Sequence, residues 1–209
     1  MKYVLSHAKQ CLRSGQEFRS HKPQHTKHFQ ALVYVLLQRA LAADLLGSIP
    51  AGDLSSIASL AVSHDVGKLW LPSEIIDKTG KLTDEEMELV KTHTVLGAAM
   101  VELAIPELCG TKQYDYAYEI CLHHHERVDG SGYPDGLRGD EIPFYVQVIG
   151  IADAYDALIS PRSYKNEMSH QKAYNMIVSG QCGTFAPELI HEFRRALFDI
   201  RNIAYQLCT

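Results

Sequence analysis

The sequence predicts an all-α fold in a single domain. Apolar residues recur at helical spacing along most of the chain, and no segment has the strict apolar–polar alternation that marks a half-buried strand. Residues that favour helix starts, such as Asp53, Thr83 and Ser169, and helix stops, such as Gly47, separate the apolar segments. With 209 residues, the chain is long enough to bury one core and to carry an extra terminal helix.

The first part of the chain is expected to hold two helices joined by a polar connector. Residues 1–14 have apolar side chains near helical spacing and precede a glycine, so they predict a short amphipathic helix. Residues 16–24 are polar and contain a proline, which is typical of a connector. A second helix is expected to begin at His25 and to end near Leu46.

Capping residues and helix breakers predict the remaining elements. Asp53 is expected to cap a helix that carries His64 at its C-terminal end. Thr83 is expected to begin a helix with a capping box, and His93 lies inside that helix. Residues 129–139 contain four glycines and a proline, and they end the helix before them. The expected helices cover residues 54–64, 83–103, 114 into the histidines at 123–125, 143–158, 169–179 and 187 onward.

The composition narrows the functional classes. The chain has 25 acidic and 20 basic residues, a formal net charge of −5, which argues against a protein that binds a nucleic-acid duplex through a basic surface. A phosphate substrate is still compatible, since bound metal ions can dominate the local potential. The five cysteines have no paired spacing, which predicts reduced thiols. Residues 1–15 hold no apolar stretch of the length expected of a signal peptide, and the given sequence has no apolar run of about 18 residues. We therefore expect a cytoplasmic protein without a membrane partner.

Residues 121–134, CLHHHERVDGSGYP, place three histidines, an acid and an arginine before a glycine-rich turn. Alone, this segment also fits an exposed helix end, and His93 or Asp153 alone fits a local or surface role. Together with His64 and Asp65 they indicate a cluster of imidazoles and carboxylates, which suits Fe, Mn, Zn or Ni. Neighbouring histidines on a helix differ in direction by about 100°, so they cannot both reach one ion from one regular face. At a helix end they can reach two neighbouring ions, which the two oxygens of Asp65 could bridge.

Four segments closely resemble the HD-GYP family, a subgroup of the HD-domain metal-dependent phosphohydrolases. The resemblance covers about residues 25–193 and implies the helical bundle of an HD domain. We expect this domain over residues 21–209, preceded by the N-terminal helix and connector over residues 1–20. The four segments are HDVGK (64–68), LPSEIIDKTGKLTDEEMELVKTH (71–93), HHERVDGSGYPDGLRGDEIP (124–143) and IADAYDALISPRSYK (151–165).

The resemblance implies seven metal ligands, with Asp65 as the bridging carboxylate. Seven ligands exceed the needs of one ion with four to six ligands, so two divalent ions are the minimum. Fe or Mn is favoured, with Zn, Ni and Mg as alternatives. A third ion would involve His21, which stands where some members have a glutamate, and it is not favoured; His28 stands where an arginine is common. The implied ligands are His25, His64, Asp65, His93, His124, His125 and Asp153.

The substrate contacts also come from the resemblance. Lys68 is expected to hold a phosphate oxygen and, with Asp65, to act in catalysis. Arg162 and Lys165 match further phosphate contacts of the family. A turn beside the substrate cleft is implicated in contacts with partners, and its residues are Gly132, Tyr133 and Pro134.

The implied function is a phosphodiesterase that hydrolyses cyclic di-GMP to linear pGpG, GMP or both, through a hydroxide that bridges the two metal ions. Two alternatives are open within the same chemistry: another cyclic dinucleotide such as cyclic GMP-AMP, or a different phosphoester. A third is a non-catalytic receptor, which binds a cyclic dinucleotide or docks a diguanylate cyclase domain through the turn at Tyr133.

Overall fold

The computed structural model describes residues 23–160 and 168–208, and the side chains of all of these except 23–26, 198 and 201–208. Within the described residues the chain is helical, and its β-type pairing is limited to two isolated bridges. The prediction of an all-α fold is therefore confirmed. The elements are α2 (Pro23–Ala42), η1 (Ala51–Asp53), α3 (Leu54–Ala61), η2 (Val66–Trp70), α4 (Ser73–Ile76), α5 (Asp84–Lys91), α6 (His93–Ala104), η3 (Pro106–Leu108), α7 (Lys112–His123), η4 (Gly139–Glu141), α8 (Phe144–Ile159), α9 (His170–Val178) and α10 (Pro187–Cys208).

The first described helix, α2, is shorter at its C-terminal end than the sequence predicts. It begins at Pro23, where proline fits because it lacks the N–H that the first turn cannot use. It ends at Ala42 rather than near Leu46, because Asp44 takes a left-handed φ of 58° and turns the chain away. The predicted helix over residues 1–14 falls outside the described residues, so the division at residue 20 stays a prediction.

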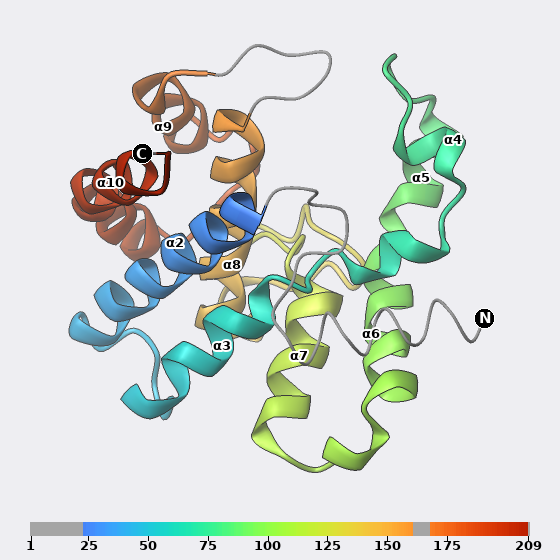
Figure 1. Cartoon of the computed structure of the whole chain (residues 1–209), viewed down its shortest axis with the longest axis horizontal. Coiled ribbons are helices and arrows are strands. Elements are labelled where there is room, and N and C mark those ends of the chain that lie inside the picture. The colour runs from blue at the N-terminus through green and yellow to red at the C-terminus, as the bar shows by residue number, and fades with distance from the viewer. Residues whose placement is uncertain (1–22, 161–167, 209) are drawn as a thin grey trace.

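Helix α8 is the centre of the main core (Figure 1). Twelve of its sixteen residues are buried, which is typical of a helix enclosed by others on all sides. It packs against α2, α7 and α9, and α10 packs in turn against α2. Among the largest buried side chains are Tyr155 and Phe193, whose ring centroids lie 5.2 Å apart in an edge-to-face contact. This packing fixes α8, which carries Asp153, against α2 and α7.

A smaller apolar cluster joins η2 to α6 and α7, and a glycine controls its geometry. A Cβ atom at Gly67 would overlap the carbonyl oxygen of His93 and lie 2.5 Å from the amide nitrogen of Gly97. Only glycine permits this close approach of η2 to α6. The approach brings Asp65, two residues earlier, to the start of α6. The buried residues of the cluster are Val66, Met100, Val101, Ala104, Ile105, Ala117 and Cys121.

Asp53 occupies the N-cap position of α3, as predicted, but its side chain makes no capping hydrogen bond there. Its carboxylate instead accepts a hydrogen bond of 2.8 Å from the hydroxyl of Tyr116 and lies 3.6 Å from Nζ of Lys112. These contacts tie the start of α3 to α7. The helix also ends at Ala61, so His64 lies in the turn that follows it.

The helix predicted over residues 83–103 is two helices, α5 and α6, which meet at Thr92. The predicted capping box is confirmed: Thr83 accepts from the amide of Glu86, and the Glu86 side chain accepts from the amide of Thr83. The break arises because the Thr92 hydroxyl donates to the carbonyl oxygen of Leu89 at 2.6 Å, in competition with main-chain donors. His93 therefore begins α6 rather than lying inside a longer helix.

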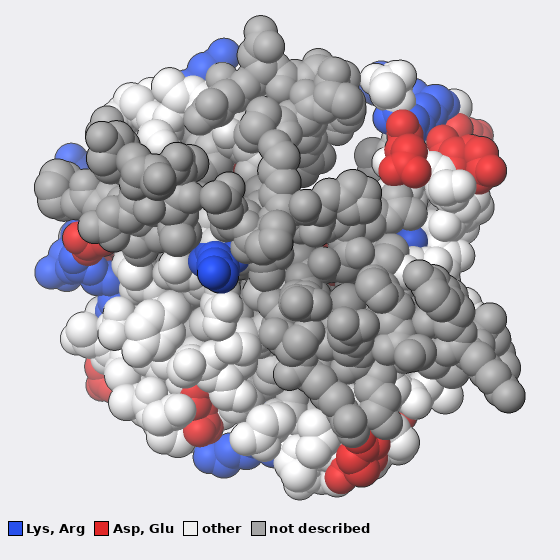
Figure 2. All heavy atoms as spheres, in the orientation of Figure 1, with Lys and Arg blue, Asp and Glu red and all other residues white. Residues whose placement is uncertain are grey.

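At the end of the protein formed by α4 and α5, basic side chains form ion pairs with acidic ones nearby in the sequence. On the face drawn in Figure 2, acidic and basic side chains lie side by side at this end of the protein. Lys78 pairs with Glu86 at 2.6 Å, and Lys91 pairs with Glu88 at 2.5 Å. Among the described helices, none is both long enough and apolar enough to cross a lipid bilayer.

Candidate metal centre

Three buried histidines are held by the same kind of backbone contact. His64, His93 and His124 are each at most 4% exposed, and Nδ1 of each ring lies close to a carbonyl oxygen three or four residues earlier. Because a carbonyl oxygen only accepts hydrogen bonds, Nδ1 of each ring carries a proton and donates it. Nε2 is then the nitrogen that faces the neighbouring side chains and can bind a metal ion. The acceptors are the carbonyls of Ala61, Val90 and Ile120, at 2.8, 2.6 and 2.9 Å.

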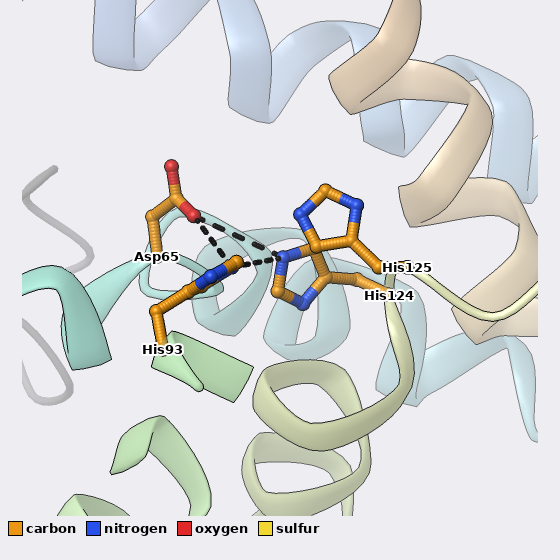
Figure 3. Close-up of side chains that lie close together, drawn as sticks. All are labelled: Asp65, His93, His124 and His125. Carbon is orange, nitrogen blue, oxygen red and sulfur yellow. Dashed lines mark hydrogen bonds and ion pairs between the residues drawn. The ribbon is translucent and has the colours of Figure 1, made fainter. Parts of the chain in front are cut away.

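The ends of helices bring the rings of His93, His124 and His125 together (Figure 3). His93 begins α6, while His124 and His125 follow the last residue of α7. At this helix end the neighbouring histidines are free of the constraint that separates them on a regular helix, and their ring centroids lie 4.2 Å apart. Ligand atoms of Asp65 and of these three histidines all lie within 4.8 Å of one another. Both adjacent histidines therefore reach one cluster.

The carboxylate of Asp65 lies between two groups of side chains. Its Oδ1 is 3.3 Å from Nε2 of His93 and 3.9 Å from Nε2 of His124. Its Oδ2 is 3.6 Å from Nε2 of His64 and 2.5 Å from Nζ of Lys68. The two oxygens thus face different imidazoles, an arrangement suited to a carboxylate that bridges two cations.

The second group contains His64 and Asp153. Oδ1 of Asp153, on α8, lies 3.4 Å from Nε2 of His64. His25 is in the first part of α2, one turn before Phe29, and the Phe29 ring lies 5.1 Å from the ring of His64. The side chain of His25 falls outside the described side chains, so its predicted part in the cluster stays a prediction.

Charges within the cluster oppose the effect of burial. Burial alone disfavours a charged ring at His64, but the carboxylates of Asp65 and Asp153 raise its pKa to about 9. Burial likewise disfavours the charged form of Asp65, yet the ammonium of Lys68 and the ring of His64 hold the pKa of Asp65 well below its usual range. Burial also opposes the charge of Asp153, but the ring of His64 lowers the pKa of that carboxyl. Both carboxylates are therefore ionised at neutral pH.

The donor set fits divalent metal ions. Burial, followed by the charge of neighbouring histidines, keeps the pKa of His124 well below its ordinary value, and burial lowers the pKa of His125 to about 3. Both rings are therefore neutral, the form that binds metal. Oδ1 of Asp65 is buried and finds no well-aligned hydrogen-bond donor among the described residues. A cation beside it would supply the missing partner.

The predicted turn at Gly132, Tyr133 and Pro134 packs against this cluster. The ring of Tyr133 stacks on the ring of His125, with centroids 4.8 Å apart and an interplanar angle of 24°. A Cβ atom at Gly132 would overlap the backbone of residues 126 and 127, so the close approach requires glycine. The buried carboxylate of Glu126 fixes the segment after the turn by accepting three amide hydrogen bonds, from Asp135, Gly136 and Leu137 at 2.7, 3.0 and 3.1 Å.

His123 has a different role from the two histidines that follow it. Its Nδ1 lies 2.6 Å from Oε2 of Glu119, and its Nε2 lies 2.9 Å from Oδ2 of Asp135. Burial opposes a charge on the ring, but these two carboxylates raise the pKa of His123. With both nitrogens engaged by carboxylates, His123 connects α7 to the segment after the turn.

Among the remaining predicted site residues, Lys68 lies beside Asp65, whereas Arg162 and Lys165 fall outside the described residues. Sequence reasoning did not single out Lys91, whose Nζ lies 5.6 Å from the centroid of the Tyr133 ring. The available signal was its position, two residues before His93. That spacing alone could not indicate a role for Lys91, because the sequence does not show that the turn at Tyr133 folds next to it.

The chain matches the model of one protein family and is similar in sequence to several proteins named as phosphodiesterases. A family model described as HD domain matches residues 19–189. The chain is 39% identical over 172 residues to a Vibrio cholerae protein named probable cyclic di-GMP phosphodiesterase, covering 81% of this chain and 39% of that protein. It is 35% identical over 127 residues to another V. cholerae protein, named 3'3'-cGAMP-specific phosphodiesterase 2, covering 61% of this chain and 23% of that protein. The matched region thus spans well under half the length of these two relatives.

A solved structure has a similar fold. Bd1817, described as an HDG"Y"P protein from Bdellovibrio bacteriovorus, matches with a TM-score of 0.60 and 21% sequence identity. The match covers 94% of this chain and 59% of the other. At 21% sequence identity, this likeness concerns the fold, that is, the arrangement of the helices.

Proposed function

The chain belongs to the HD domain family, and on that premise we propose that it is a metal-dependent phosphodiesterase that hydrolyses cyclic di-GMP to linear pGpG, GMP or both. The observation that carries the proposal is the position of Asp65. One carboxylate oxygen faces His93 and His124, and the other faces His64. This is the arrangement expected of a two-metal phosphodiesterase site.

Seven side chains would hold the ions. The rings of His124 and His125 are already neutral, the form that binds metal, whereas at His64 an ion would displace the proton that the neighbouring carboxylates favour. Bound divalent ions supply Lewis acidity and an activated water. Fe or Mn is our proposed occupant, since imidazole and carboxylate ligands without thiolates suit both. The proposed ligands are His25, His64, Asp65, His93, His124, His125 and Asp153.

Lys68 supplies a positive charge at the open edge of the cluster. Its side chain is 26% exposed, and its ammonium lies beside Oδ2 of Asp65. In that position it can hold a phosphate oxygen and offset the charge that builds on the non-bridging oxygens during hydrolysis. Arg162 and Lys165 are proposed as further phosphate contacts on the resemblance to the family alone.

A second candidate substrate is cyclic GMP-AMP. The name of one V. cholerae relative favours it, and a two-metal site would cleave the phosphodiester of either nucleotide. A non-catalytic receptor is a weaker candidate, because binding alone does not require paired carboxylates and neutral imidazoles at a phosphate site. Contact with a diguanylate cyclase through the turn at Tyr133, and action in the cytoplasm, remain predictions.

The test is direct hydrolysis by the full chain. Purified protein loaded with Mn²⁺ or Fe²⁺ is incubated separately with cyclic di-GMP and with cyclic GMP-AMP, and products are separated by chromatography. We expect linear pGpG or GMP from cyclic di-GMP. Faster turnover of cyclic GMP-AMP would favour the second candidate, and binding without turnover under any metal would favour the receptor.

A further inference from the structure

The cluster has a closed side and an open side. The closed side consists of His64, His93 and His124, whose rings are almost completely buried. On the open side, the side chains of Asp65, Lys68 and Asp153 are between 25% and 27% exposed. Among the described residues, an anionic substrate therefore meets the cluster from the side on which Lys68 lies.

A second lysine, Lys91, lies beside the turn that packs against the cluster. It is the last residue of α5, its side chain is 37% exposed, and its ammonium lies 5.6 Å from the centroid of the Tyr133 ring. That ring stacks on His125 and lies 6.4 Å from the ring of His93. Lys91 is thus separated from the cluster by a single aromatic ring.

The two lysines differ in what holds them. Lys68 is paired with Asp65, which belongs to the cluster itself. Lys91 is paired with Glu88, whose side chain is 70% exposed. An ion pair this exposed contributes little, because water screens it and two long side chains must be ordered. Lys91 can therefore exchange Glu88 for a phosphate oxygen at small cost.

A cyclic dinucleotide carries two phosphodiester groups, and only one of them is cleaved at a time. The scissile group needs the cluster and Lys68, which leaves the other phosphate to be balanced elsewhere. We infer that Lys91 binds this second, non-reacting phosphate beside Tyr133 and so favours cyclic dinucleotides over small phosphodiesters. This inference rests on the proposed function and adds a specificity-determining residue to it.

The experiment compares two substrates on the Mn²⁺-loaded full chain: cyclic di-GMP, with two phosphates, and bis(4-nitrophenyl) phosphate, with one. Lys91→Gln is expected to raise KM for cyclic di-GMP roughly tenfold, the usual effect of losing a charged hydrogen bond to phosphate, with kcat within about twofold. KM for the small substrate should not change. Lys91→Arg keeps the charge and should restore most of the affinity. Lys112→Gln, which removes an exposed lysine near Asp53, is the matched control and should leave KM unchanged for both substrates.

Glu88→Gln sharpens the test, because it removes the competing partner of Lys91. We expect KM for cyclic di-GMP to fall or stay the same in this variant. An equal rise of KM for both substrates in Lys91→Gln would instead indicate a general change of the site and would overturn the inference. No change for cyclic di-GMP would also overturn it.

Calorimetric titration of cyclic di-GMP into the loaded protein separates this inference from the proposed function. If the wild-type chain binds the nucleotide but does not cleave it, the proposed hydrolysis fails, while weaker binding by Lys91→Gln would still support the role of Lys91. If the wild-type chain cleaves cyclic di-GMP and Lys91→Gln binds it equally well, the inference about Lys91 fails alone. If the wild-type chain neither binds nor cleaves it, both are wrong.

Discussion

The closed and open sides of the histidine cluster are held in place by different forces. On the closed side, His64, His93 and His124 each donate Nδ1–H to a carbonyl three or four residues earlier, at the end of the preceding helix, so local backbone geometry sets the direction of each ring. On the open side, Asp65 and Lys68 are held mainly by each other and by the rings that they face. The closed side is therefore a rigid support, whereas the open side depends on charge and is the part that chemistry would use.

Removing the carboxylate that joins the two sides should have the largest effect. We expect Asp65→Ala to lower turnover of cyclic di-GMP by at least about a hundredfold, since it removes the proposed bridge and a charge partner of His64. Steady-state kinetics and metal content would be measured together on the full chain. Asp140→Ala, which removes an exposed acid in η4, serves as the control. Activity close to that of wild type in Asp65→Ala would contradict the assignment of Asp65.

Removing the lysine of the open side should have a smaller effect of a different kind. Lys68→Ala is expected to lower kcat roughly ten- to a hundredfold, because a charge that stabilises the phosphate oxygens is lost. The metal content, measured by elemental analysis, should stay unchanged, since the ammonium is not a ligand. Loss of metal in this variant would mean that the role of Lys68 is misassigned.

The close contact of η2 with α6, which positions His93, can be disrupted by a substitution at Gly67. Gly67→Ala forces a Cβ into the backbone of His93 and Gly97, so we expect a loss of about 1–3 kcal/mol in the free energy of unfolding. Urea denaturation would measure it. Gly80→Ala is the matched control, because a Cβ there meets nothing within 4 Å, and its effect should stay within about 0.5 kcal/mol. Equal effects of the two changes would show that the contact of η2 with α6 is not tight.

The smallest predicted effect is the pH dependence of the stabilisation by Asp129, which lies in the loop between α7 and η4. Hydrogen bonds from Ser131 and then Thr184 lower the pKa of Asp129 from 3.8 to about 2. A lowered pKa means that ionised Asp129 stabilises the folded state fully above about pH 4, and that this contribution is lost as the pH falls through 2. Asp129→Asn should therefore lower the melting temperature slightly at pH 7 and leave it nearly unchanged near pH 2. A difference between the two proteins that is independent of pH would rule out this role for the charge.

The closed side and the fold were the most predictable parts of the molecule from sequence. Helical periodicity gave the all-α fold, and the capping box at Thr83 and the cap at Ser169 are present as expected, because both depend on residues within one turn of each other. The side chains of His64, Asp65, His93, His124 and His125 do lie together. Their role as ligands stays a prediction until metal is measured.

Features that depend on distant contacts were not predictable. Asp53 looks like a helix cap locally, but the hydroxyl of Tyr116, on a helix far along the chain, takes its carboxylate. The break at Thr92 is local, but it depends on which donor takes the carbonyl oxygen of Leu89, which periodicity does not report. Lys91 gains meaning only when the turn at Tyr133 is folded against α5 and His125.

We expect the two sides of the cluster together to hold two divalent ions. Elemental analysis of the full chain, purified without oxygen, tests this most directly when the wild-type protein and Asp65→Ala are compared. We expect about two ions per chain in the wild-type protein and a clear loss in the variant, because Asp65 would be a ligand of both ions. An absence of bound metal, or the same metal content in both proteins, would contradict it.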